Sequence, residues 1–138
     1  MEGPKQELPD ILFLVLHEGG TLIYAYPPIG KQGHSLASLV SAISALGEQL
    51  LGKTEEVSHT SVGKYTVSFL QQGEVIYSLF ISKKCEGDFR GLLLTLSDLV
   101  RSDFPAQISD GILEMEGGTE DLTRNIEGTI KTYRRLLK

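Results

Sequence analysis

The chain has 138 residues, a formal net charge of −5 and 22% charged residues. This length favours one domain, because domains run roughly 100–200 residues. The acidic balance argues against nucleic-acid binding, which relies on a basic surface. A single cysteine excludes an intrachain disulfide framework and is typical of a reducing compartment. The apolar run Ile11–Leu16 is far shorter than the ~20 residues of a membrane-spanning helix. We therefore expect a cytoplasmic protein.

The N-terminal part of the chain predicts a short lead-in followed by a hairpin. Residues 1–9 are polar, contain two prolines and predict a flexible lead-in to a single domain over residues 10–138. Ile11–Leu16 is a continuous apolar run, which predicts a strand buried on both faces. After a turn at Gly19 and Gly20, Thr21–Tyr26 is rich in β-formers and predicts the second strand of the hairpin.

An amphipathic helix is predicted next. Ser35 is suited to be its N-cap, and Gly52 stands where a helix commonly ends. Between them, apolar residues recur every three or four positions, as on one face of a helix. The predicted apolar stripe consists of Leu36, Leu39, Val40, Ile43, Leu46 and Leu50.

Three further strands are predicted at Glu55–Val62, Tyr65–Gln71 and Val75–Ser82, with turns at Gly63 and Gly73. The connections are too short for parallel crossovers, so these strands form an antiparallel meander. Two helices follow, one capped by Asp88 and one by Thr119.

The predicted order is therefore β-β-α-β-β-β-α-α, and each helix has one apolar face that must be covered. This predicts an α+β fold: a five-stranded antiparallel sheet with the first helix on one face and the last two on the other. Ile11–Leu16 and Val75–Ser82 are expected to be central neighbours, and Thr21–Tyr26 is expected at an edge.

No catalytic, cofactor-binding or metal-binding residues are predicted. Residues 47–54 fit the phosphate-loop pattern GxxxxGK[ST], but they end a helix and do not begin one. The three histidines lack metal partners at ligand spacing. Cys85 follows Lys83 and Lys84, which are expected to lower its pKa, yet no positioned base accompanies it. We predict that the protein is not an enzyme.

The most informative feature is a stretch without charge. No charged residue stands between Lys31 and Glu48, and small uncharged residues occupy the predicted outer face of the first helix. Charge depletion and small side chains are typical of interface cores. The neighbouring edge strand is also uncharged, and a bare edge invites pairing. The residues predicted to mediate self-association are Thr21, Ile23, Tyr24, Ser38, Ser41, Ala42 and Ala45. A solvated Ser/Ala face is the alternative.

Basic residues gather near the end of the last helix, at Lys131, Arg134, Arg135 and Lys138. They complement the negative end of the helix dipole, which is the interpretation we favour. Contact with an anionic membrane is the alternative.

The element order resembles that of the longin domain, the profilin-like module of trafficking proteins, and also that of its near neighbour, the roadblock domain. The resemblance covers residues 10–137 and rests on ILFLVLHEGGTLIYAY, SLASLVSAISALGEQLLG and GKYTVSFLQQGEVIYSLFIS. Roadblock domains usually place a helix before the first strand, and residues 1–9 are too short for it. The resemblance implies a non-enzymatic module without cofactors that dimerises and contacts small GTPases.

We therefore predict a dimerising adaptor that binds a small GTPase or a vesicle-trafficking partner. Its other subunit is a second copy or a related longin or roadblock chain, and any peripheral membrane association goes through a partner. The alternatives are a roadblock-like GTPase regulator subunit, a small-molecule-binding sensory domain whose pocket would be lined by convergent polar groups, and an enzyme that uses Cys85.

Overall fold

The computed structural model describes residues 9–28, 31–51, 58–85, 87–103 and 119–136. The strands are β1 (Ile11–His17), β2 (Leu22–Tyr26), β3 (Ser58–Val62), β4 (Tyr65–Gln72) and β5 (Val75–Ser82). The helices are α1 (Lys31–Leu51), α2 (Arg90–Asp103) and α4 (Thr119–Leu136). The predicted element order is confirmed. The lead-in over residues 1–8 and the connector over residues 106–118 lie outside the described residues.

The five strands form one antiparallel sheet in the order β2-β1-β5-β4-β3. β1 and β5 pair along their whole length, from Ile11 opposite Ile81 to His17 opposite Val75. This confirms that they are central neighbours and explains why both are continuous apolar runs, since each face of both strands is covered. β2 and β3 are the two edges.

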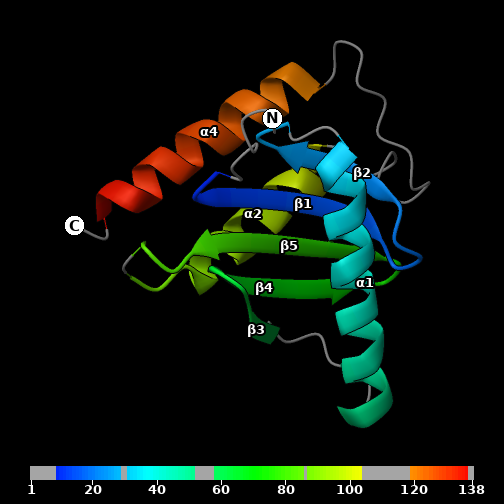
Figure 1. The fold of residues 1–138 in the computed structure, drawn as a ribbon. Helices are drawn as coiled ribbons and strands as arrows, with labels where there is room; N and C mark the ends of the chain where they lie inside the picture. The colour runs from blue at the N-terminus through cyan, green and yellow to red at the C-terminus, as the bar shows by residue number, and fades with distance from the viewer. Residues whose placement is uncertain (1–8, 29–30, 52–57, 86, 104–118, 137–138) are drawn as a thin grey trace, which may run out of the picture.

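The helices cover the two faces of the sheet unequally, as Figure 1 shows. Of the described helices, α1 lies on one face, whereas α2 and α4 lie together on the other. Successive β1 residues point to opposite faces, so Leu12 and Leu14 pack under α1 while Phe13 and Val15 pack under α2 and α4. The predicted division of the helices between the faces is confirmed.

Two predictions about α1 are wrong. The helix begins at Lys31, so Ser35 lies inside it and is not its N-cap. The buried stripe is also rotated from the predicted one: Ala37 is fully buried and Ser44 is 8% exposed, whereas Leu39 is 37% exposed. The reason is the close approach of α1 to the strand ends, where only small side chains fit.

Candidate functional site

The predicted interface residues of α1 do not all face solvent. Ser38, Ala42 and Ala45 are exposed, whereas Ser41 is half-buried and its hydroxyl donates to the carbonyl oxygen of Glu18. Gly20 has φ of 98°, and a Cβ added there would lie 3.6 Å from the Cα of Ser38. The small residues at 38 and 41 therefore admit the chain's own β1–β2 turn.

A chain of hydrogen bonds fixes α1 across the ends of the strands. The Ser44 hydroxyl donates to Gln71 Oε1 at 3.1 Å. The Gln71 amide nitrogen donates to Glu18 Oε2 at 2.9 Å and to the Gly73 carbonyl at 3.0 Å. These bonds join the helix to the β1–β2 turn and to the β4–β5 turn. They leave the outward face of α1 with Ser35, Leu39, Ala42 and Ala45 exposed and without charge.

The predicted interface residues of β2 are mostly turned into the molecule. Thr21 is exposed, but Ile23 is 8% exposed and Tyr24 only 2%. The Tyr24 hydroxyl is 2.7 Å from the Thr123 hydroxyl on α4. The side chains of Ile23 and Tyr24 therefore belong to the core and not to a surface, because this face of β2 lies under α4. At this edge Ile23 and Tyr24 therefore offer another chain their backbone and not their side chains.

The two sheet edges differ in regularity. The register between β1 and β2 shifts once. Val15 of β1 pairs with Tyr24, and the next residue, Leu16, pairs with Leu22, so Ile23 of β2 is an extra residue. Such a bulge twists an edge strand away from flat pairing. β3 pairs with β4 without a shift from Ser58 to Val62 and contains no Pro, Lys, Arg, Asp or Glu. β3 is therefore the edge better suited to pairing with another strand.

Among the described residues, the sheet face beside β3 is incompletely covered. Val62, Tyr65 and Phe69 pack against the α1-side cluster but stay half-buried. α1 runs across the ends of the strands and reaches β4 through Ser44, so none of the described helices lies above the middle of β3 and β4. The sequence pattern placed Tyr65 and Phe69 on one face of the strand, but it gave no signal that this face lacks a cover.

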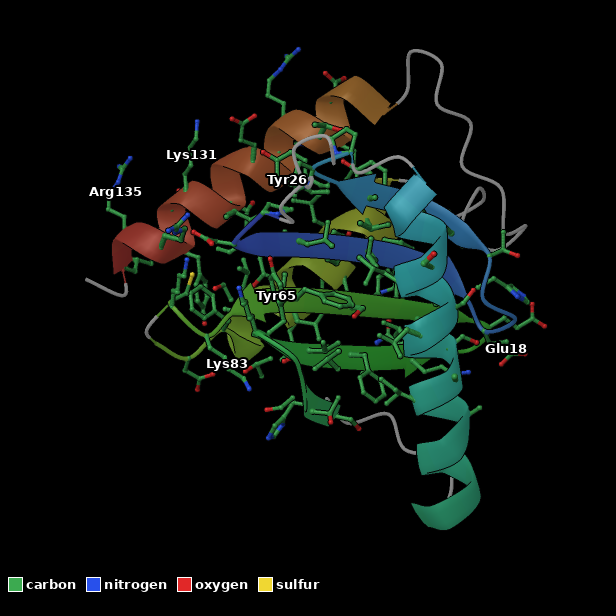
Figure 2. The ribbon with its side chains drawn as sticks, viewed as in Figure 1. Glu18, Tyr26, Tyr65, Lys83, Lys131 and Arg135 are labelled. Atoms are coloured by element: carbon green, nitrogen blue, oxygen red, sulfur yellow. The ribbon has the colours of Figure 1, made fainter. Side chains whose placement is uncertain are left out.

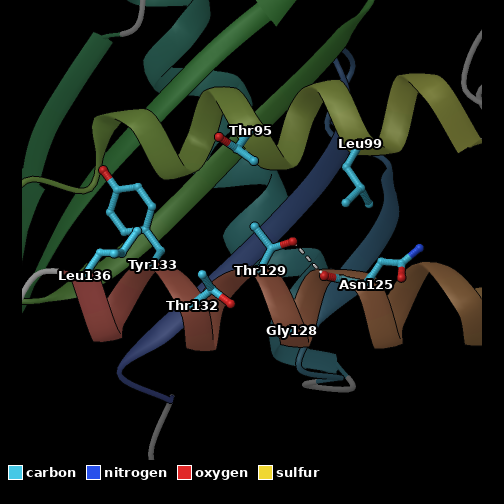
Figure 3. Close-up of a pocket in the computed structure, with 8 residues that line it drawn as sticks. All are labelled: Thr95, Leu99, Asn125, Gly128, Thr129, Thr132, Tyr133 and Leu136. Carbon is cyan, nitrogen blue, oxygen red and sulfur yellow. Dashed lines mark hydrogen bonds between the residues drawn. The ribbon is translucent and has the colours of Figure 1, made fainter.

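Two hollows on the other face of the sheet are open to the surface. One, of about 510 Å³, lies between α2 and α4 and is lined by Thr95, Leu99, Asn125, Thr129 and their neighbours (Figure 3). The Thr129 hydroxyl donates to the Asn125 carbonyl at 2.8 Å. The Thr95 hydroxyl likewise donates to a carbonyl oxygen of its own helix, that of Gly91. Hydroxyl groups that bond within their own helices do not favour the small-molecule hypothesis, which requires polar groups that converge on a ligand.

A second hollow, of about 350 Å³, lies beside Cys85 and includes His59. Burial raises the pKa of the Cys85 thiol above its ordinary value, Asp10 adds to this rise, and Arg134 opposes it. The predicted lowering by the neighbouring lysines is wrong, because burial has the larger effect. The thiol is held in its protonated form, which is the poorer nucleophile.

Two other kinds of site were sought in the part of the chain that the structure describes. It contains no group of three or more His, Cys, Asp or Glu side chains placed to hold a metal ion. None of its helices is both long enough and apolar enough to span a membrane.

Comparison with known proteins places the fold. No family model matches the sequence, and no curated protein matches it. Among solved structures, the chain is similar to a Roadblock/LC7 domain from Streptomyces avermitilis, with a TM-score of 0.58, 14% identity, and coverage of 75% of this chain and 90% of that one.

Two bacterial proteins are also similar. The match to Myxococcus xanthus MglB has a TM-score of 0.46 at 17% identity, covering 85% of this chain and 83% of that one. The match to the gliding protein MglB from Thermus thermophilus has a TM-score of 0.49 at 13% identity, covering 85% and 78%. This chain has an α+β fold, with a five-stranded antiparallel sheet flanked by helices. Its similarity to the Streptomyces domain shows that the chain shares this fold with roadblock and longin-like domains.

Proposed function

We propose that the protein is a non-enzymatic adaptor that forms a dimer and presents a surface to a small GTPase or to a vesicle-trafficking partner. Its fold, like that of the Streptomyces Roadblock/LC7 domain, supports this class of function. The roadblock-like GTPase regulator subunit is the form of the proposal that this likeness favours. The observation that carries the self-association is the incompletely covered face beside β3.

A second copy of the chain is the proposed cover for that face. One helix cannot cover five strands, and the half-buried Val62 and Phe69 mark the part that α1 leaves open. The final turns of α1 extend beyond β4 in Figure 1. A helix that extends past its own sheet is suited to lie over a neighbour's.

The geometry of such a dimer follows from two-fold symmetry. Antiparallel pairing of two β3 strands joins the two sheets into one, and the two α1 helices then lie side by side on the same face. The exposed, uncharged Ser38, Ala42 and Ala45 provide the flat surface that close helix packing requires. Pairing through β2, as the sequence predicted, is the alternative arrangement, and its bulge disfavours it.

A single substitution tests this surface. Ala42→Arg places a charge at the centre of the proposed helix contact, and a buried unpaired charge is strongly unfavourable. We expect the variant to sediment as a folded monomer where the wild type is a dimer. Ser102→Arg, at an exposed position of α2 on the other side of the sheet, is the matched control and should remain a dimer. A dimeric Ala42→Arg variant would contradict the proposed surface.

The GTPase partner requires a separate test. The protein and its Ala42→Arg variant would be used to capture the small GTPases of the source organism, each loaded with GDP or with a GTP analogue. We expect one nucleotide state to bind preferentially, since its switch segments differ from those of the other state. Failure of every GTPase to bind in both states would refute the GTPase part of the proposal and leave the dimer untouched.

A further inference from the structure

Exposed basic side chains gather at one end of this acidic protein. They come from three separate places in the chain: the β3–β4 turn, the β5–α2 loop and the last turn of α4. We call this group the basic edge, and it consists of Lys64, Lys83, Lys84, Arg134 and Arg135, all exposed. Figure 2 shows Lys83 and Arg135 on the side of the molecule away from α1, with Arg135 directed away from the sheet, as Lys131 is.

Backbone and side-chain contacts hold the three segments together. The Lys83 amide donates to the Lys64 carbonyl at 2.8 Å, which joins the loop to the β3–β4 turn. The Tyr133 hydroxyl donates to the Asp88 carbonyl at 2.7 Å, which joins the end of α4 to the same loop. Gly91 makes room for this contact, because a Cβ there would lie 3.0 Å from the Tyr133 oxygen. The basic edge is therefore a property of the fold and not of one segment.

The charges of the basic edge are not neutralised within the described part of the chain. None of its five members forms an ion pair there, in contrast to Lys131, whose amine is 3.1 Å from Glu127. Among the described residues, the acids beside it are Asp10, which acts on the neighbouring Cys85, and Asp88. Within that described part, five basic residues stand against two acids, in a chain whose net charge is −5.

An apolar side chain at the end of α4 follows these cations in the chain and lines the groove between α2 and α4. Leu136 directly follows Arg134 and Arg135 and is 79% exposed, the highest value among the exposed large hydrophobic residues described. A protruding leucine beside flexible cations is the arrangement by which peripheral proteins contact a lipid surface. An acidic protein partner would match the cations alone and gives no reason for the leucine.

We propose that the basic edge docks directly on an anionic membrane surface, with the cations at the headgroups and Leu136 at the acyl boundary. The overall negative charge does not prevent this, because charges more than about 8 Å from the lipid surface are largely screened at physiological salt. Lys64 lies next to the end of β3, whereas the other four members of the basic edge lie on the β5–α2 loop and on α4. The inference therefore does not require the proposed dimer.

The test is co-sedimentation with vesicles of phosphatidylcholine alone or mixed with phosphatidylserine. We expect binding only to the anionic vesicles and its loss at about 1 M salt, where the screening length falls to about 3 Å. Each cation near an anionic surface strengthens binding roughly fivefold, so Arg134→Gln with Arg135→Gln should weaken it about 25-fold. Leu136→Ser should weaken it further.

The controls separate the basic edge from net charge and from misfolding. Arg101→Gln with Arg124→Gln removes the same charge from exposed pairs elsewhere and should leave binding unchanged. Lys83→Gln with Lys84→Gln tests the edge without altering α4 and should also weaken binding. No binding to anionic vesicles would overturn the proposal, as would equal loss in the control pair. Capture by an acidic peptide without vesicle binding would assign the edge to a protein partner and overturn it too.

Discussion

The two faces of the sheet are built differently although they share the same strands. Among the described residues, the α2/α4 face has a buried cluster of 18 hydrophobic residues with four partly buried ones around it. In the same described part, the α1 face has 8 buried residues and 6 partly buried ones. Leu92, Leu93 and Leu96 of α2 are fully buried, whereas α1 meets the sheet through Ala37, Val40 and Ser44. Within the described residues, the α2/α4 face is the more fully covered of the two.

This difference indicates that one face of the sheet provides most of the stability and the other provides the surface for recognition. Burial of large apolar side chains dominates folding, so the α2/α4 face provides most of the stability. The α1 face uses small residues and the Ser44–Gln71–Glu18 hydrogen bonds, which fix the helix without consuming much apolar surface. The half-buried Val62 and Phe69 then remain available for contact with a second chain.

The largest expected difference between the faces is in the free energy of unfolding that is lost when a leucine side chain is truncated. Leu96→Ala removes a fully buried side chain and should lower the free energy of unfolding by about 2–5 kcal/mol. Leu36→Ala makes the same chemical change on half-buried Leu36 of α1 and should cost about 1 kcal/mol. Urea unfolding measures both values. Equal losses would contradict the assignment of stability to the α2/α4 face.

Alkaline pH should weaken the α2/α4 face selectively. Burial raises the pKa of Tyr77 to about 12, and it also raises the pKa of Tyr24; both lie in that cluster. The folded pKa of Tyr77 exceeds the unfolded value of about 10, so the fold favours the neutral hydroxyl. Its contribution is complete below about pH 10 and is lost as pH rises toward 12. Urea unfolding across this range measures the decline, which Tyr77→Phe should reduce. An unchanged decline in that variant would assign it to other groups.

A smaller effect is expected from the bond between β2 and α4. Tyr24→Phe removes the hydroxyl that lies 2.7 Å from Thr123 and keeps the ring in place. Its loss should lower the free energy of unfolding by about 1 kcal/mol. Thr129→Val is the comparison, because its bond stays within α4 and is exposed. A larger loss from the α4 change would show that the Tyr24 contact does not secure the edge strand.

Much of the fold could be predicted from the sequence because its patterns are strong. The continuous apolar runs of β1 and β5 identified the central pair, and the bounds of Val75–Ser82 agree with the prediction. The alternation of Tyr65, Val67 and Phe69 placed them on one face. The start of α1 was missed because the Ser35 cap signal is local, while the helix extends back to Lys31.

The candidate site was harder to predict because it depends on close approach between distant segments. A stripe of large residues suggested that Leu39 is buried, but α1 lies against the β1–β2 turn, where Ser38 and Ser41 fit. The bulge at Ile23, which distinguishes the two edges, has no signature in the alternation of β2. The basic edge joins three segments, of which the sequence showed only the one on α4.

The central claim is that a second copy covers the open side of the α1 face and pairs with β3. Amide hydrogen exchange, measured across a dilution series, tests it most directly. We predict that the amides of Ser58–Val62 that do not bond to β4 become protected as protein concentration rises, while the outer amides of Leu22–Tyr26 exchange at the same rate throughout. Exchange of β3 that is independent of concentration, or protection confined to β2, would contradict the account.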